Sequence, residues 1–136
     1  MSSPPLELTP FRVLVVEDEA VTRTALTLLL EYQGAAVVAA GSVKEGIQLL
    51  EGKFQPDILL SNIRLPDGTG AVVLQYLRHQ DSMRQRQTPA IALTGEDLET
   101  VQEDPEFAGF QLYLSKPFDA RMLVSAIVTL IERDFN

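Results

Sequence analysis

The sequence contains no cysteine. This absence excludes disulfide bonds, thiolate metal sites and cysteine nucleophiles, and it fits a reducing compartment, so we expect a cytoplasmic location. Basic residues are also scarce, since 11 lysines and arginines stand against 19 aspartates and glutamates and give a net charge of −8. A chain of this charge repels nucleic acid and anionic membranes, so we expect direct binding to neither.

Long hydrophobic runs and glycine-rich phosphate loops are absent as well. No apolar run approaches the length of a membrane helix, and no GxGxxG or P-loop pattern predicts a nucleotide or flavin site. The 136 residues, 46% of them hydrophobic, have the size and composition of one globular domain. Residues 1–10 lack the layout of a signal peptide, and we interpret them as a tail or linker before a domain at 11–136.

Short apolar runs alternate with segments of helical periodicity along this domain. Continuous apolar runs are typical of strands buried on both faces, and the pattern (βα)5 predicts an open, doubly wound α/β fold with a parallel sheet. The expected strands are 12–16, 35–40, 57–61, 90–94 and 112–115, and the expected helices are 20–32, a segment ending near 51, 71–77, a weak one near 98, and 119–133.

Two helices carry specific signals. Ser42 and Glu45 form a capping box that marks the start of the second helix. In the first helix, apolar residues at helical spacing predict an amphipathic segment; they are Val21, Ala25, Leu28, Leu29 and Tyr32.

Polar residues follow the strands at their carboxyl ends, where ligands bind in open α/β sheets. Crowded carboxylates there are normally relieved by a hard cation with oxygen ligands, for which Mg²⁺ is the usual candidate. A lysine and a hydroxyl opposite that cation would hold a phosphoryl group. The residues are Glu17, Asp18 and Glu19 after the first strand, Asn62 after the third, Thr94 after the fourth and Lys116 after the fifth.

Four segments in order, "VLVVEDE", "PDILLSNIRLPDGTG", "IALTGE" and "YLSKPF", resemble the signature segments of response-regulator receiver domains. The resemblance covers the chain from about Arg12 to its end. It implies a flavodoxin-like five-stranded parallel sheet with strand order 2-1-3-4-5. It also implies a non-enzymatic signalling module that accepts a phosphoryl group from a sensor histidine kinase or a histidine phosphotransfer protein.

The same resemblance implies roles for individual residues. Lys116 would face the phosphoryl group, and Thr94 and Tyr113 would form the switch that repacks the face from Leu98 to Glu132, through which the module would self-associate or bind an output partner. The Lys116–Pro117 bond is cis in the family. The implied Mg²⁺ ligands are Glu17, Asp18, the side chain at position 62 and the backbone carbonyl of Arg64.

Asn62 stands where the family has its phosphorylated aspartate. An amide is neutral and cannot form the acyl phosphate, so we expect this chain to be unable to accept a phosphoryl group and to bind Mg²⁺ only weakly. Asn62 can still donate to Glu17 or Asp18 and accept from Lys116. Without a phosphoryl group, we expect Thr94 to lie away from Asn62 and Tyr113 to face outward.

Two alternatives remain from the residues. One is a native pseudo-receiver that acts by binding, independently of phosphorylation. The other is a phosphohydrolase of the haloacid-dehalogenase type, which also uses a strand-end aspartate. That chemistry requires an Asp-x-Asp loop, whereas Asp18 is followed two positions later by Ala20.

Overall fold

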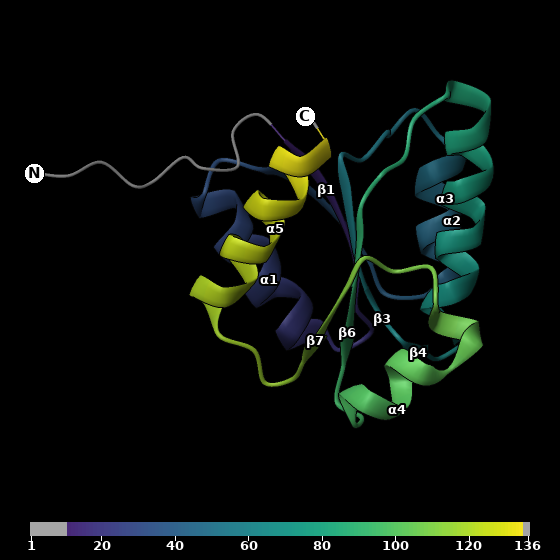
Figure 1. The fold of residues 1–136 in the computed structure, drawn as a ribbon. Coiled ribbons are helices and arrows are strands. Elements are labelled where there is room, and N and C mark those ends of the chain that lie inside the picture. The colour runs from purple at the N-terminus through teal and green to yellow at the C-terminus, as the bar shows by residue number, and fades with distance from the viewer. Residues whose placement is uncertain (1–10, 135–136) are drawn as a thin grey trace, which may run out of the picture.

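The computed structural model describes residues 11–134, so the tail predicted at 1–10 lies outside the described residues. Its centre is a five-stranded parallel sheet in the order β2-β1-β3-β6-β7, which is the predicted 2-1-3-4-5 when these strands are counted along the chain (Figure 1). The strands are β1 (Arg12–Val16), β2 (Ala36–Ala40), β3 (Ile58–Asn62), β6 (Ala90–Thr94) and β7 (Leu112–Ser115).

Helices cover both faces of this sheet, as Figure 1 shows, with α1 and α5 on one side and α2 and α3 on the other. Within residues 11–134, no helix is long and apolar enough to cross a membrane. The helices are α1 (Ala20–Tyr32), α2 (Val43–Glu51), α3 (Gly70–Arg84), α4 (Leu98–Glu103) and α5 (Ala120–Asp134).

The hydrophobic core lies in two layers, one on each side of the sheet. The three central strands are buried along almost their whole length, and their side chains alternate between the layers. Leu14 and Leu59 point to the α2 and α3 side, whereas Val13 and Leu60 point to the α1 and α5 side. This burial explains why the strands were recognisable as continuous apolar runs.

The buried face of α1 differs from the predicted one. Leu26 and Leu30, four residues apart, are the buried side chains of this helix, whereas Val21, Leu28 and Tyr32 are 79%, 61% and 58% exposed. Apolar residues surround most of the helix, so more than one stripe satisfies helical periodicity. Contact with the sheet selects the stripe that is buried.

Helix α3 is longer than the predicted segment 71–77 and runs to Arg84. Its last turns are polar, and the buried Asp81 anchors them because its carboxylate accepts hydrogen bonds from the Thr88 amide at 2.9 Å and the Thr88 hydroxyl at 2.8 Å. The helix ends at Gln85, which has a left-handed backbone with φ of 56°. Hydrophobic periodicity missed this extension because a polar network stabilises it.

Two further elements were not predicted. A two-stranded hairpin, β4 (Arg64–Leu65) and β5 (Gly68–Thr69), follows β3, and a 3-10 helix, η1 (Pro105–Phe107), follows α4. One half of the predicted capping box of α2 is confirmed, since the Ser42 hydroxyl accepts from the Glu45 amide at 3.1 Å, whereas the Glu45 carboxylate accepts from the Gly41 amide at 2.6 Å and not from Ser42. The Lys116–Pro117 bond is cis, as the family resemblance implied.

Gly70 is the point where α3 starts against the end of β3. A Cβ atom there would lie 2.3 Å from the backbone oxygen of Asn62 and 2.7 Å from the hydroxyl oxygen of Ser61. The Gly70 amide donates to the Ile63 carbonyl at 2.9 Å, which holds the helix start close to the strand. Only glycine fits this approach without a shift of the backbone.

We therefore expect Gly70→Ala to lower the free energy of unfolding by roughly 3 kcal/mol, the upper end of the usual cost of overpacking, because backbone atoms must move. Gly95→Ala is the matched control, since a Cβ atom at Gly95 would meet nothing within 4 Å. Urea denaturation of both variants checks this expectation. Equal stability of the two variants would show that the backbone at the end of β3 moves away from residue 70 at little cost in free energy.

Candidate functional site

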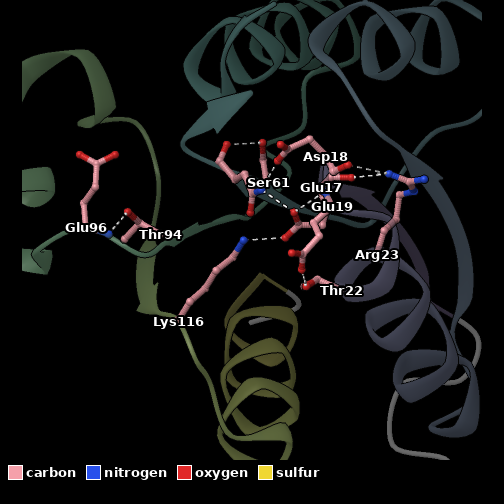
Figure 2. A network of polar contacts seen from close by, with 10 residues as sticks. Glu17, Asp18, Glu19, Thr22, Arg23, Ser61, Thr94, Glu96 and Lys116 are labelled. Atoms are coloured by element: carbon pink, nitrogen blue, oxygen red, sulfur yellow. Dashed lines mark hydrogen bonds and ion pairs between the residues drawn. The ribbon is translucent and has the colours of Figure 1, made fainter. Parts of the chain in front are cut away.

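The carboxyl ends of the strands bring most of the predicted residues together (Figure 2). Glu17 directly follows β1 and is only 1% exposed, and Lys116, which follows β7, reaches it across the sheet edge. The Lys116 Nζ atom lies 2.6 Å from Glu17 Oε1. The buried carboxylate is therefore paired with a cation, which is the condition for keeping its charge in the interior.

Asn62, the last residue of β3, joins the two acidic side chains. Its Nδ2 atom donates to Glu17 Oε2 at 2.8 Å and to Asp18 Oδ1 at 2.9 Å, so both predicted donations are present. The predicted acceptance from Lys116 is wrong, because Lys116 bonds the charged Glu17 and not the neutral amide oxygen. Asn62 Oδ1 is buried and has no hydrogen-bond partner.

Arg23 in the first turn of α1 contributes to the site, although it was not among the predicted site residues. Its Nη1 atom donates to the backbone carbonyl of Glu17 at 2.9 Å and to that of Asp18 at 3.3 Å. The guanidinium passes over Gly41, where a Cβ atom would lie 2.9 Å from Arg23 Nη1. Two features of the sequence could have indicated this contact. Arg23 follows the acidic pair Glu17 and Asp18 in the first turn of α1, and Gly41 follows the neighbouring strand β2.

Thr94, at the end of β6, is buried, but its hydroxyl points toward its own loop. The Oγ1 atom accepts from the Glu96 amide at 2.9 Å, and in the described part of the chain no hydrogen bond joins Thr94 to Asn62. Glu96 in turn pairs with Arg64, whose Nε atom lies 2.9 Å from Glu96 Oε2. This hydrogen bond raises the pKa of Arg64 above its usual value.

Tyr113 lies on β7 and faces inward, so the expectation that it would turn outward is wrong. Its hydroxyl donates to the backbone carbonyl of Phe107, and its ring packs edge-on against Phe110 with 6.2 Å between the ring centroids. The ring is half-buried, and this burial raises the pKa of Tyr113. Packing and a satisfied hydroxyl hold the inward position without any contact to Asn62.

Arg64 extends from the hairpin toward η1. Its guanidinium carbon lies 5.2 Å from the centroid of the Phe107 ring, a cation–π contact, in addition to the ion pair with Glu96. Arg64 therefore contacts the same 3-10 helix, η1, whose Phe107 carbonyl accepts the hydrogen bond from the Tyr113 hydroxyl. The family resemblance implied a role only for the Arg64 backbone carbonyl, so these side-chain contacts were not predicted.

The oxygen atoms at this edge of the sheet suit a hard cation only if the Asn62 amide turns its oxygen toward the Glu17 and Asp18 carboxylates. Among residues 11–134, no three histidine, cysteine, aspartate or glutamate side chains form a group that could hold a metal ion. Glu17 and Asp18 supply two carboxylates, and the unpartnered Oδ1 of Asn62 would add a third oxygen if the amide turned to present it. In the observed orientation, the amide hydrogens take the place of a cation between the carboxylates.

Comparison with known proteins decides the family. Residues 13–128 match the family model of the response regulator receiver domain. The chain belongs to the response-regulator receiver domains. It is 34% identical, over 85% of its length and 86% of the relative, to an uncharacterized 14.6 kDa protein of Leptolyngbya boryana.

Longer regulators and solved receiver structures are also similar. The chain is 30% identical to the phosphate regulon transcriptional regulatory protein PhoB of Escherichia coli, of which it matches 52% while 90% of its own length is covered. The receiver domain of sensor histidine kinase PA1611 from Pseudomonas aeruginosa, solved with a magnesium ion in its active-site cleft, superposes with a TM-score of 0.77 at 29% identity, covering 90% of this chain and 98% of that one. This receiver domain thus spans about half the length of the transcriptional regulator that it resembles.

A structure of chemotaxis response regulator CheY4 of Vibrio cholerae gives a TM-score of 0.78 at 24% identity, over 90% of this chain and 99% of that one, and it supports the fold alone. The fold, the family and the signalling class implied by the sequence are confirmed by these matches. The assignment to a receiver family leaves the hydrolase alternative without support.

Asn62→Asp tests the role of the amide. It removes both donors between Glu17 and Asp18 and adds a third negative charge, so we expect the free energy of unfolding in the absence of divalent cations to fall by roughly 2–4 kcal/mol. We expect Mg²⁺ to restore most of this loss and to stabilise the parent much less. Thermal denaturation with EDTA and with Mg²⁺ measures both effects.

Asn62→Ala is the control, because it removes the donors without adding charge. We expect it to be destabilised and to show no Mg²⁺ rescue beyond that of the parent. An Asn62→Asp variant as stable as the parent in EDTA would contradict a stabilising amide bridge.

Proposed function

We propose that this chain is a receiver module of a two-component phosphorelay whose phosphoacceptor position is blocked by Asn62. One observation carries the proposal: the Asn62 amide lies between the Glu17 and Asp18 carboxylates, at the strand end that Lys116 also reaches. This is where the resemblance places the acceptor aspartate. Glu17, Asp18 and Lys116 lie around it, and Thr94 ends the neighbouring strand β6.

With an aspartate at position 62, the carboxylate oxygen would attack the phosphorus of a phosphohistidine, and the bond from phosphorus to the histidine nitrogen would break. Lys116 would leave Glu17 and donate to a phosphoryl oxygen, and the Thr94 hydroxyl would leave the Glu96 amide to donate to another. When bound, Mg²⁺ would neutralise phosphoryl charge. Its ligands would be Glu17, Asp18, the side chain at position 62 and the Arg64 backbone carbonyl.

Asn62 stops this chemistry at its first step. The amide nitrogen shares its lone pair with the carbonyl group, and the neutral oxygen is a weak nucleophile, so no acyl phosphate forms. The amide also lacks the charge that would draw Mg²⁺ into the site, and we infer that this chain binds the metal more weakly than its Asn62→Asp variant.

A pseudo-receiver is the second candidate, and a specific observation favours it. Lys116 and the Asn62 amide already occupy the Glu17 carboxylate, so the site is closed by direct contacts that need neither metal nor phosphate. Such a module would act in the cytoplasm by binding alone. Its partner would recognise a fixed surface and not a phosphorylation state.

We infer that the upstream partner is a sensor histidine kinase or a histidine phosphotransfer protein. The face from Leu98 to Glu132 would serve for self-association or for binding an output partner. This face contains Tyr113 and the Phe107 carbonyl that accepts its hydrogen bond. Sedimentation velocity of the Asn62→Asp variant, with and without a small-molecule phosphodonor, tests self-association. A sedimentation coefficient unchanged by the phosphodonor would contradict phosphorylation-dependent self-association.

The decisive experiment measures intact mass after incubation with acetyl phosphate and Mg²⁺. We expect the Asn62→Asp variant to gain one phosphoryl group and the parent to gain none, because Glu17, Asp18 and Lys116 lie at the same strand ends as position 62. The Asn62→Asp variant that also carries Lys116→Ala is the control, and we expect it to accumulate far less label. Labelling of the parent at any residue would contradict the acceptor assignment.

Absence of label on Asn62→Asp, in a variant shown to be folded, would favour the pseudo-receiver instead.

A further inference from the structure

Tyr113 faces inward because the segment after α4 offers its side chain two partners. The Phe107 carbonyl in η1 accepts the hydrogen bond from the Tyr113 hydroxyl, and the Phe110 ring packs edge-on against the Tyr113 ring. Both phenylalanine side chains are buried in the core layer on the α2 and α3 side of the sheet. The position of Tyr113 therefore depends on where η1 and the turn after it lie.

The segment that carries η1 has little stability of its own. Helix α4 has six residues and η1 has three, and isolated helices of this length are marginal in water. The sequence from Glu96 to Glu106 includes six carboxylates and no basic residue, so its charges repel one another. Val101 and Phe107 anchor the segment in the core, and its remaining stability depends on contacts from other segments.

The hairpin after β3 supplies two such contacts, one from each of its strands. From β4, the guanidinium carbon of Arg64 lies 5.2 Å from the centroid of the Phe107 ring. From β5, the Thr69 hydroxyl donates to Glu106 Oε2 at 3.2 Å. Both contacts end on η1, so the hairpin and η1 lie side by side.

Glu96 holds the Arg64 guanidinium in place over the ring. Its Oε2 atom accepts from Arg64 Nε at 2.9 Å, and its Oε1 atom accepts from Arg64 Nη2 at 3.4 Å. A guanidinium bound along its edge by both oxygens of a carboxylate keeps its flat face free to lie on an aromatic ring. The ion pair and the ring contact therefore support each other.

We propose that Arg64 is a positioning residue for Tyr113: by lying over the Phe107 ring, its side chain stabilises η1 where the Phe107 carbonyl holds the Tyr113 hydroxyl. This arrangement uses no atom of Asn62, no metal ion and no phosphoryl group, so it does not depend on the proposed function. The Arg64 side chain is 58% exposed, so it lies where a partner protein can reach it. A partner that draws the guanidinium away from Phe107 would increase the population of outward Tyr113.

Nitration of tyrosine by tetranitromethane at low conversion, read by peptide mass spectrometry, tests the positioning role. The rate at which Tyr113 reacts is proportional to the fraction of molecules in which it faces outward, and no cysteine competes for the reagent. Tyr32, which is 58% exposed, is the internal reference for a tyrosine in water. Tyr76 in α3 is half-buried and reports general loosening of the fold.

We expect Arg64→Ala to increase the nitration rate of Tyr113, relative to that of Tyr32, by about two- to fivefold, the effect of an exposed cation–π contact. The rate of Tyr76 should not change. Arg64→Lys keeps a cation near the ring without the planar fork, so we expect a smaller increase than in Arg64→Ala. Circular dichroism establishes that each variant is folded, and Arg64→Lys supplies the measurement if Arg64→Ala is not.

Arg86→Ala is the matched control, because Arg86 pairs with Asp57 at 3.7 Å before β3, at the opposite end of the sheet. We expect it to leave the Tyr113 rate unchanged. An unchanged Tyr113 rate in folded Arg64→Ala would overturn the inference, and so would equal increases at Tyr113 and Tyr76. Equal increases in Arg64→Lys and Arg64→Ala would contradict the cation–π contact as the cause.

Discussion

The edge of the sheet is organised by the need to keep one buried carboxylate charged. Glu17 is almost completely enclosed, and an ionised carboxylate in that position costs several kcal/mol unless cations or hydrogen-bond donors surround it. Lys116 and Asn62 supply these donors from β7 and β3, and the Glu19 amide adds a third at 2.9 Å. Because the donors come from different strands, compensation of this charge also fixes how the strand ends lie relative to one another.

The fold was accessible from the sequence because it depends on features that repeat locally. Strands β1, β3 and β6 are buried on both faces, so each is a continuous apolar run whose end can be read directly. Position along the chain then placed Glu17, Asn62 and Lys116 at one edge, and the structure brings them into contact. The exposed stripe of α1 shows where this reasoning fails: when apolar residues surround a helix, periodicity alone does not identify the side that faces the sheet.

The choice of partners could not be derived in the same way. Lys116 had two acceptors within the same site and bonds the charged one, and Tyr113 satisfies its hydroxyl at the Phe107 carbonyl in an unpredicted 3-10 helix. Arg23 donates to backbone carbonyls of the loop after β1, and the positions of these carbonyls depend on the folded chain. The Arg23 and Tyr113 contacts thus share a cause: each joins a side chain to a peptide carbonyl whose position only the folded chain defines.

Tyr113 and Thr94 are held by contacts with their own neighbours in this structure. The inward position of Tyr113 is stabilised by its bond to Phe107 and by the Phe110 ring, and the Thr94 hydroxyl is held by the Glu96 amide. None of these contacts involves position 62. A ligand shifts a conformational equilibrium only by its difference in affinity for the two states, and an amide already bonded to Glu17 and Asp18 has no phosphoryl oxygens with which to draw Thr94 closer. In this structure the Tyr113 ring and the Thr94 hydroxyl are therefore held by their own neighbours and not by the side chain at position 62.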